Sequence, residues 1–118
     1  MTAITPPDAH LIDDEQNPEL IKAKIVSETA RINWRELQKF YAAGSVISVS
    51  PSLDLVEVAF AFNRDDKNAV ANWLATGLVE RTSEQQASGW YQQQTELWAA
   101  VVSPWILVQD KPLTNALN

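Results

Sequence analysis

The chain has 118 residues, 46% of them hydrophobic, with no cysteine and a single histidine. This length fits one domain with a self-sufficient core, and the lack of cysteine excludes disulfides, iron–sulfur clusters, thiolate nucleophiles and cysteine zinc sites. The net charge of −6 arises mainly in residues 1–19, which hold five acidic residues and no basic one. We expect no cofactor and no metal. The basic residues of 20–44 are interspersed with acids, which does not favour nucleic acid as a partner.

The two ends of the chain differ in composition from its middle. Residues 1–16 combine Pro6 and Pro7 with four acidic residues and few large apolar ones, which predicts a mobile acidic leader. We expect a single domain over 17–110 and a frayed tail over 111–118. No apolar stretch approaches the ~18 residues of a membrane span, and the start lacks the layout of a secretion signal. These features predict a cytoplasmic protein that does not bind membranes.

Periodicity and capping residues predict the first elements. Pro18 suits the first turn of a helix, and apolar residues at three- and four-residue spacings continue it to Ala30. Asn33 predicts the N-cap of a second helix, which Gly44 closes; two helices are favoured over one kinked helix across 18–43. Alternating apolar residues and serines over 45–50 predict a short strand.

The segment 53–62 fits either a strand or a helix, because its apolar residues share one face both in the two-residue period of a strand and in the 3.6-residue period of a helix. Ser52 as an N-cap and Asp54 in the first turn favour a helix over a strand. The next elements are a helix that starts at Asp65 or Asp66 and ends at Gly77, a strand over 78–81, and a helix from Thr82 or Ser83 to about Gln93.

The longest predicted strand covers 97–108 and is interrupted by Pro104. A proline inside a strand implies an edge position or a bulge. Trp98 and Trp105 are seven residues apart, so regular pairing would place them on opposite faces unless a bulge resets the phase. The fold class is α+β, with a small, mostly antiparallel sheet of about three strands packed with four to five helices, which we expect to cover one face.

Few side chains suited to catalysis are present. There is no glycine-rich phosphate loop, no GxSxG and no HExxH sequence, and the single histidine lies in the leader. The weak catalytic candidates are two carboxylates three residues apart, Asp54 and Glu57, together with Arg35 and Glu36 around an aromatic pocket lined by Trp34. A small-molecule binder or enzyme built from them requires that these groups converge in space.

The five tryptophans favour another function. Several tryptophans often lie at core edges or interfaces, because a buried indole needs a partner for its N–H group. We take Trp98, Trp105 and Trp34 as candidate interaction residues, although packing in the core is the simpler explanation for Trp34. The leading hypothesis is an interaction or regulatory module that binds a protein partner or a second copy of itself, and a homodimer is its simplest form.

Four segments carry a resemblance to a known family: ETARINWRELQKFYAAGSVISV, PSLDLVEVA, WLATG and ELWAAVVSPWILVQD. In this order they resemble a small uncharacterised bacterial family, a domain of unknown function found mainly in proteobacteria and cyanobacteria. The resemblance covers roughly residues 20–110. It implies a stand-alone soluble domain without an assigned reaction, cofactor, partner or catalytic residue.

Overall fold

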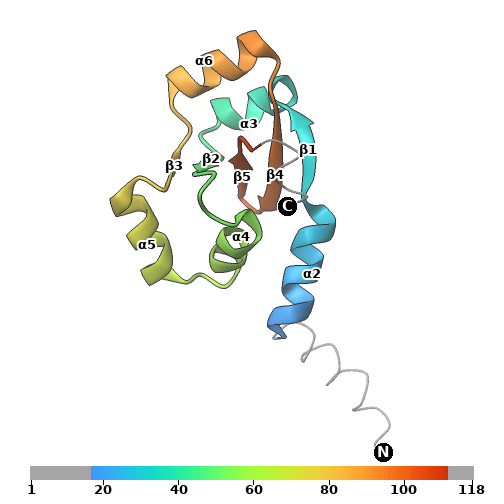
Figure 1. Ribbon diagram of the computed structural model, residues 1–118, viewed down its shortest axis with the longest axis vertical. Helices are drawn as coiled ribbons and strands as arrows, with labels where there is room; N and C mark the ends of the chain where they lie inside the picture. Colours follow the sequence, from blue (N-terminus) through green and yellow to red (C-terminus); the bar gives the residue numbers. More distant parts are fainter. Residues whose placement is uncertain (1–16, 112–118) are drawn as a thin grey trace, which may run out of the picture.

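The computed structural model describes residues 17–111, so the predictions for the leader and for residues 112–118 lie outside the described part (Figure 1). The chain forms one mixed sheet in the order β1-β4-β5-β2-β3. Neighbouring strands are antiparallel except for β2 and β5, which are parallel. The strands are β1 (Ala30–Asn33), β2 (Val46–Val49), β3 (Val79–Arg81), β4 (Glu96–Val102) and β5 (Trp105–Gln109).

The α+β class is confirmed, but the expectation of about three strands is wrong. The strand β1 was not predicted; it is four residues long and lies between the first two helical segments. The single strand predicted over 97–108 is in fact two strands, β4 and β5, which form an antiparallel hairpin in the middle of the sheet. Short strands without an alternating pattern are not visible in the sequence, because their partners are distant in the chain.

Pro104 marks a turn and not an edge strand or a bulge. It lies between β4 and β5, where its missing N–H group costs no ladder hydrogen bond, and the Ser103–Pro104 peptide is cis. The turn also resets the side-chain phase. Trp98 pairs with Gln109, and Trp105 pairs with Val102, so both tryptophans point to the same face.

The predicted helices are present, with most of their predicted caps. The segment 53–62 forms a helix as favoured, but the helix begins at Leu55, and Asp54, rather than Ser52, caps it by accepting from the N–H of Val56 at 2.9 Å. Gly77 ends its helix with a φ of 76°. No helix within residues 17–111 is long and apolar enough to cross a membrane. The helical segments are α2 (Pro18–Glu28), η1 (Trp34–Leu37), α3 (Gln38–Ala42), α4 (Leu55–Asn63), α5 (Lys67–Thr76) and α6 (Glu84–Gln93).

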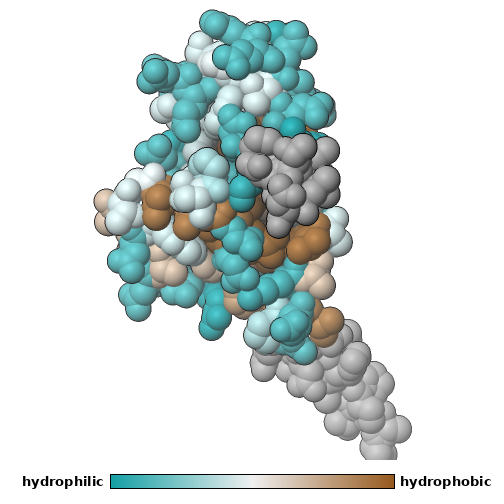
Figure 2. Space-filling view, in the orientation of Figure 1, coloured by the Kyte–Doolittle hydropathy of each residue, from teal (hydrophilic) through white to brown (hydrophobic). Residues whose placement is uncertain are grey.

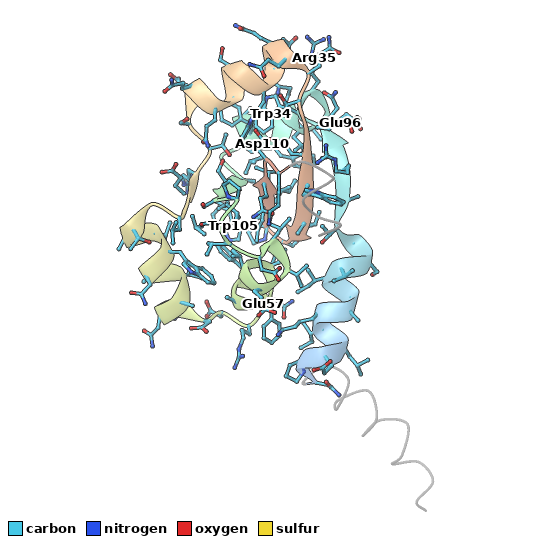
Figure 3. The ribbon with its side chains drawn as sticks, in the orientation of Figure 1. Trp34, Arg35, Glu57, Glu96, Trp105 and Asp110 are labelled. Carbon is cyan, nitrogen blue, oxygen red and sulfur yellow. The ribbon has the colours of Figure 1, made fainter. Side chains whose placement is uncertain are left out.

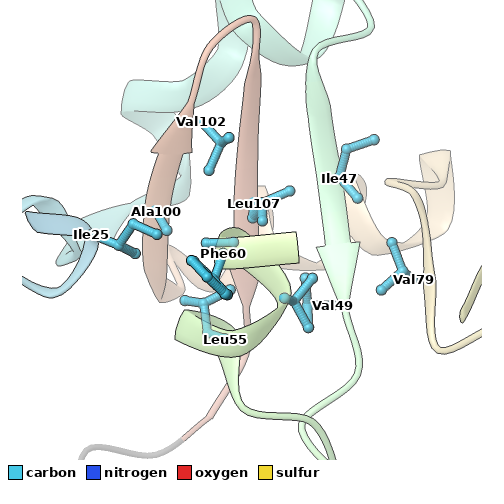
Figure 4. Packing of buried hydrophobic residues seen from close by; sticks show 11 residues of the cluster. Ile25, Ile47, Val49, Leu55, Phe60, Val79, Ala100, Val102 and Leu107 are labelled. Carbon is cyan, nitrogen blue, oxygen red and sulfur yellow. The ribbon is translucent and has the colours of Figure 1, made fainter. Parts of the chain in front are cut away.

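Helices cover both faces of the sheet, so the expectation of one covered face is wrong. The central strands are apolar on both sides, and an apolar sheet face must be covered to be buried. On the first face, α2 and α4 pack on a cluster that includes Ile25, Phe60 and Leu107 (Figure 4). On the second face, η1 and α6 contribute Trp34, Leu37 and Ala87 to a separate cluster.

Candidate functional site

The four weak catalytic candidates do not converge. Asp54 caps α4, and Glu57 forms an exposed ion pair in which its Oε2 lies 3.0 Å from Lys22 Nζ. Arg35 and Glu36 belong to η1 on the other side of the sheet, where the Arg35 guanidinium stacks 4.4 Å from the Tyr91 ring centroid. Figure 3 shows Arg35 and Glu57 at opposite ends of the domain. Within residues 17–111 no three His, Cys, Asp or Glu side chains gather as a metal site requires.

Trp34 is a core residue in this structure. Its side chain is 0% exposed, and its ring centroid lies 5.5 Å from that of Tyr41 and 5.2 Å from that of Trp90. These are ordinary aromatic packing distances. A fully buried ring cannot meet a partner directly, so Trp34 acts by supporting the elements around it.

Trp98 and Trp105 are half-buried in the first face of the sheet. Each lies beneath an arginine of an edge strand: the Arg31 guanidinium is 5.3 Å from the Trp98 ring centroid, and that of Arg81 is 5.8 Å from Trp105. Arg31 is directly opposite Trp98 in the pairing of β1 with β4. Such cation–π contacts cover the rings partly, so these tryptophans do not form a bare edge of the sheet.

A free strand edge exists instead at the end of β4. The pairing of β1 with β4 stops at Ala99, whereas the pairing of β4 with β5 continues to Val102. Residues 100–102 therefore pair on one side only. Val101 in this stretch is 53% exposed, a large value for a valine in a central strand.

A groove of about 700 Å³ runs along this free edge. Val101 and Val102 both line it although consecutive strand side chains point to opposite faces, so the groove wraps around the edge of the sheet. Figure 2 shows hydrophobic residues gathered around the middle of the molecule, away from the hydrophilic end formed by α6. We name this site the α2–β4 groove; its lining includes Leu20, Lys24, Ile25, Glu28, Val101 and Val102.

The polar lining of the α2–β4 groove is balanced in charge. Lys24 and Glu28 lie one helical turn apart on α2, and both border the groove. The rest of its lining is uncharged: apolar residues such as Leu20, which is 47% exposed, together with Asn63 and Ser103. A groove of mixed apolar and polar lining, with one charge of each sign, suits a protein surface better than a charged metabolite.

The α2–β4 groove could not be predicted from the sequence, for a structural reason. Its position depends on where β1 ends relative to β4, and α2 adjoins β4 only because the chain turns between Glu28 and Ala30. Gln109 was not predicted either; it is a buried amide whose Nε2 donates to the carbonyls of Ser50 and Leu53 at 2.9 and 2.8 Å. A polar residue ending an apolar run was the only sequence signal for Gln109.

Comparisons with known proteins match a family and a solved structure. The family described as "Protein of unknown function (DUF2288)" matches residues 20–110. The NMR solution structure of PA1075 from Pseudomonas aeruginosa is similar, with a TM-score of 0.70 and 41% sequence identity over 80% of this chain and 87% of that chain. No curated protein matches.

Proposed function

This chain belongs to the DUF2288 family, and for this member we propose a role as an interaction module that pairs with a second copy of itself through the α2–β4 groove. The observation that carries the proposal is the free edge of β4 inside that groove, with Val101 exposed on it. The proposal includes the cytoplasmic location that the sequence predicts.

The backbone of residues 100–102 supports pairing between two copies. An unpaired strand edge offers free N–H and C=O groups to another strand. Two β4 ends related by a twofold axis run antiparallel, so each copy offers the other the same three residues. This arrangement would extend the sheet across the dimer and cover the exposed side chain of Val101.

The charges of the groove support a second copy over a strongly charged partner. In a twofold interface, if residue i of one copy contacts residue j of the other, then j also contacts i. Lys24 of each copy can then face Glu28 of the other copy, so the interface contains this ion pair twice. A basic or acidic partner would meet one favourable and one unfavourable charge.

The mass in solution tests the proposal. Light scattering after size exclusion should give twice the chain mass of 13.2 kDa at micromolar concentration. Val101→Glu places a charge on the apolar edge and should give a monomer. Leu74→Glu is the matched control, because Leu74 on α5 is 52% exposed, close to the 53% of Val101, and does not line the groove. A monomeric parent chain, or a dimer that survives Val101→Glu, contradicts the proposal.

Charge exchange tests the orientation of the two copies. Lys24→Glu and Glu28→Lys should each weaken the dimer, because each places like charges opposite one another. The double exchange should restore dimerisation. If the double variant is as weak as the single ones, the twofold arrangement with Lys24 facing Glu28 is wrong.

A further inference from the structure

A second hollow, which we name the polar groove, lies on the other face of the sheet and has a volume of about 360 Å³. It lies where the parallel strands β2 and β5 end, a part of a sheet where ligands commonly bind. In Figure 3 one of its residues, Asp110, lies in the upper half of the domain, on the side of α6. Its polar lining consists of Ser48, Ser50, Glu80, Gln86, Trp90 and Asp110.

The floor of the polar groove is held by a network of hydrogen bonds. The buried hydroxyl of Ser48 lies 2.8 Å from Thr82 Oγ1 and donates to Gln86 Oε1 at 3.2 Å. Gln86 Oε1 also accepts from the N–H of Ser83 at 3.0 Å, within the capping box of α6. A backbone N–H group can only donate, so this contact sets the orientation of the Gln86 amide. The part of the groove formed by Ser48 and Gln86 is therefore preorganised, and the exposed carboxylates of Glu80 and Asp110 border it.

The charge of the polar groove is negative. Glu80 lies directly opposite Ser48 in the pairing of β2 with β3, so both side chains are on the groove face. Asp110 follows β5, and its Oδ2 accepts from Trp90 Nε1 at 3.3 Å. No lysine, arginine or histidine among residues 17–111 lines this groove. It thus brings together two carboxylates, a tryptophan ring and fixed hydrogen-bonding groups.

We propose that the polar groove binds a small organic cation that carries N–H donors, such as an alkylammonium or a guanidinium compound. The carboxylates of Glu80 and Asp110 would accept its N–H groups in charge-assisted hydrogen bonds. Trp90 is half-buried, lines the groove and donates its indole N–H group to Asp110, and indole rings attract cations. The volume is within the range of small-molecule pockets, which extends from about 300 to 1,000 Å³.

Agmatine, which carries a guanidinium and an ammonium group, is the probe for a titration of the full ¹⁵N-labelled chain. The Trp90 indole N–H resonance should shift and saturate, because this group donates to Asp110. 1,4-Butanediol has the same carbon chain without charge and should cause no saturating shift. The proposal is overturned if agmatine does not saturate this resonance at millimolar concentration, or if butanediol binds equally well.

Isosteric variants separate a specific site from general attraction. Asp110→Asn and Glu80→Gln should each weaken agmatine binding by about tenfold or more, because each removes a charged acceptor. Glu84→Gln changes the net charge equally on α6 but does not line the groove, so its binding should match the parent. Equal weakening in all three variants would overturn the proposal. The Val101→Glu variant should retain full agmatine binding, which separates this test from that of self-association.

Discussion

The two faces of the sheet are covered by different means. On the first face, α4 buries five of its nine residues: Leu55, Val58, Ala59, Phe60 and Ala61. On the second face, α6 buries only Ala87 of its ten residues, and the largest buried side chain there is Trp34 from η1. A helix with a broad apolar face attaches through its own side chains, whereas a polar helix depends on a large neighbour and on its caps.

The largest expected effect concerns Trp34. Trp34→Ala should reduce the free energy of unfolding by about 3–5 kcal/mol, because it leaves a cavity beneath α6. Trp34→Phe should cost less, since the indole N–H is buried without a hydrogen-bond partner in the described part of the chain. Denaturant unfolding measures both losses. In Trp34→Ala, hydrogen exchange should also become faster in α6 than in α4. Equal protection of the two helices would contradict the conclusion that α6 depends on Trp34 more than α4 does.

A smaller effect is expected on the first face, at the loop that leads into α4. Gln109→Leu removes both donors to the carbonyls of Ser50 and Leu53, and the expected loss is about 1–3 kcal/mol. Gln92→Leu on the exposed side of α6 is the control and should be nearly neutral. Chemical denaturation would compare them. If the two variants were equally stable, the role of Gln109 in anchoring this loop would be refuted.

The smallest effects concern the helix caps. Asp54→Ala and Ser83→Ala should each cost about 1 kcal/mol, because each leaves N-terminal N–H groups of a helix without an acceptor. The consequences for the two helices should differ. α4 should stay docked through its apolar face, whereas α6 should exchange its amide hydrogens faster, as measured by hydrogen exchange. Equal protection of α6 in both variants would show that the cap of α6 does not help to hold this helix on the second face of the sheet.

Local patterns predicted the elements whose signals lie within a few residues. The helices after Asp66 and Ser83 begin at predicted capping residues, and glycines end the segments at 44 and 77. The helix after Asp54 was also predicted, although with its cap at Ser52. β1 was missed because its pairing with β4 joins residues more than sixty positions apart. Pro104 was misread for a related reason: the sequence shows that a proline interrupts an apolar run, but a bulge and a hairpin turn interrupt it alike.

The sequence predicted the candidate sites less well than it predicted the fold. Asp54 and Glu57 have the spacing of a carboxylate pair, but one caps α4 and the other pairs with Lys22. The α2–β4 groove brings together residues from three separate segments of the chain. The polar groove brings together residues from four or more, as Ser48, Glu80, Trp90 and Asp110 show. None of those residues forms a local motif with another.

The amino-acid sequence alone determined the class of this protein, its main helices, and the absence of cysteine chemistry, because composition, periodicity and capping act over short distances along the chain. Tertiary structure decided the order of the strands, the two-sided covering of the sheet, and the positions of both grooves. These features depend on which distant segments pair and where each pairing stops. That choice is made by burial of the whole apolar surface, which no single segment contains.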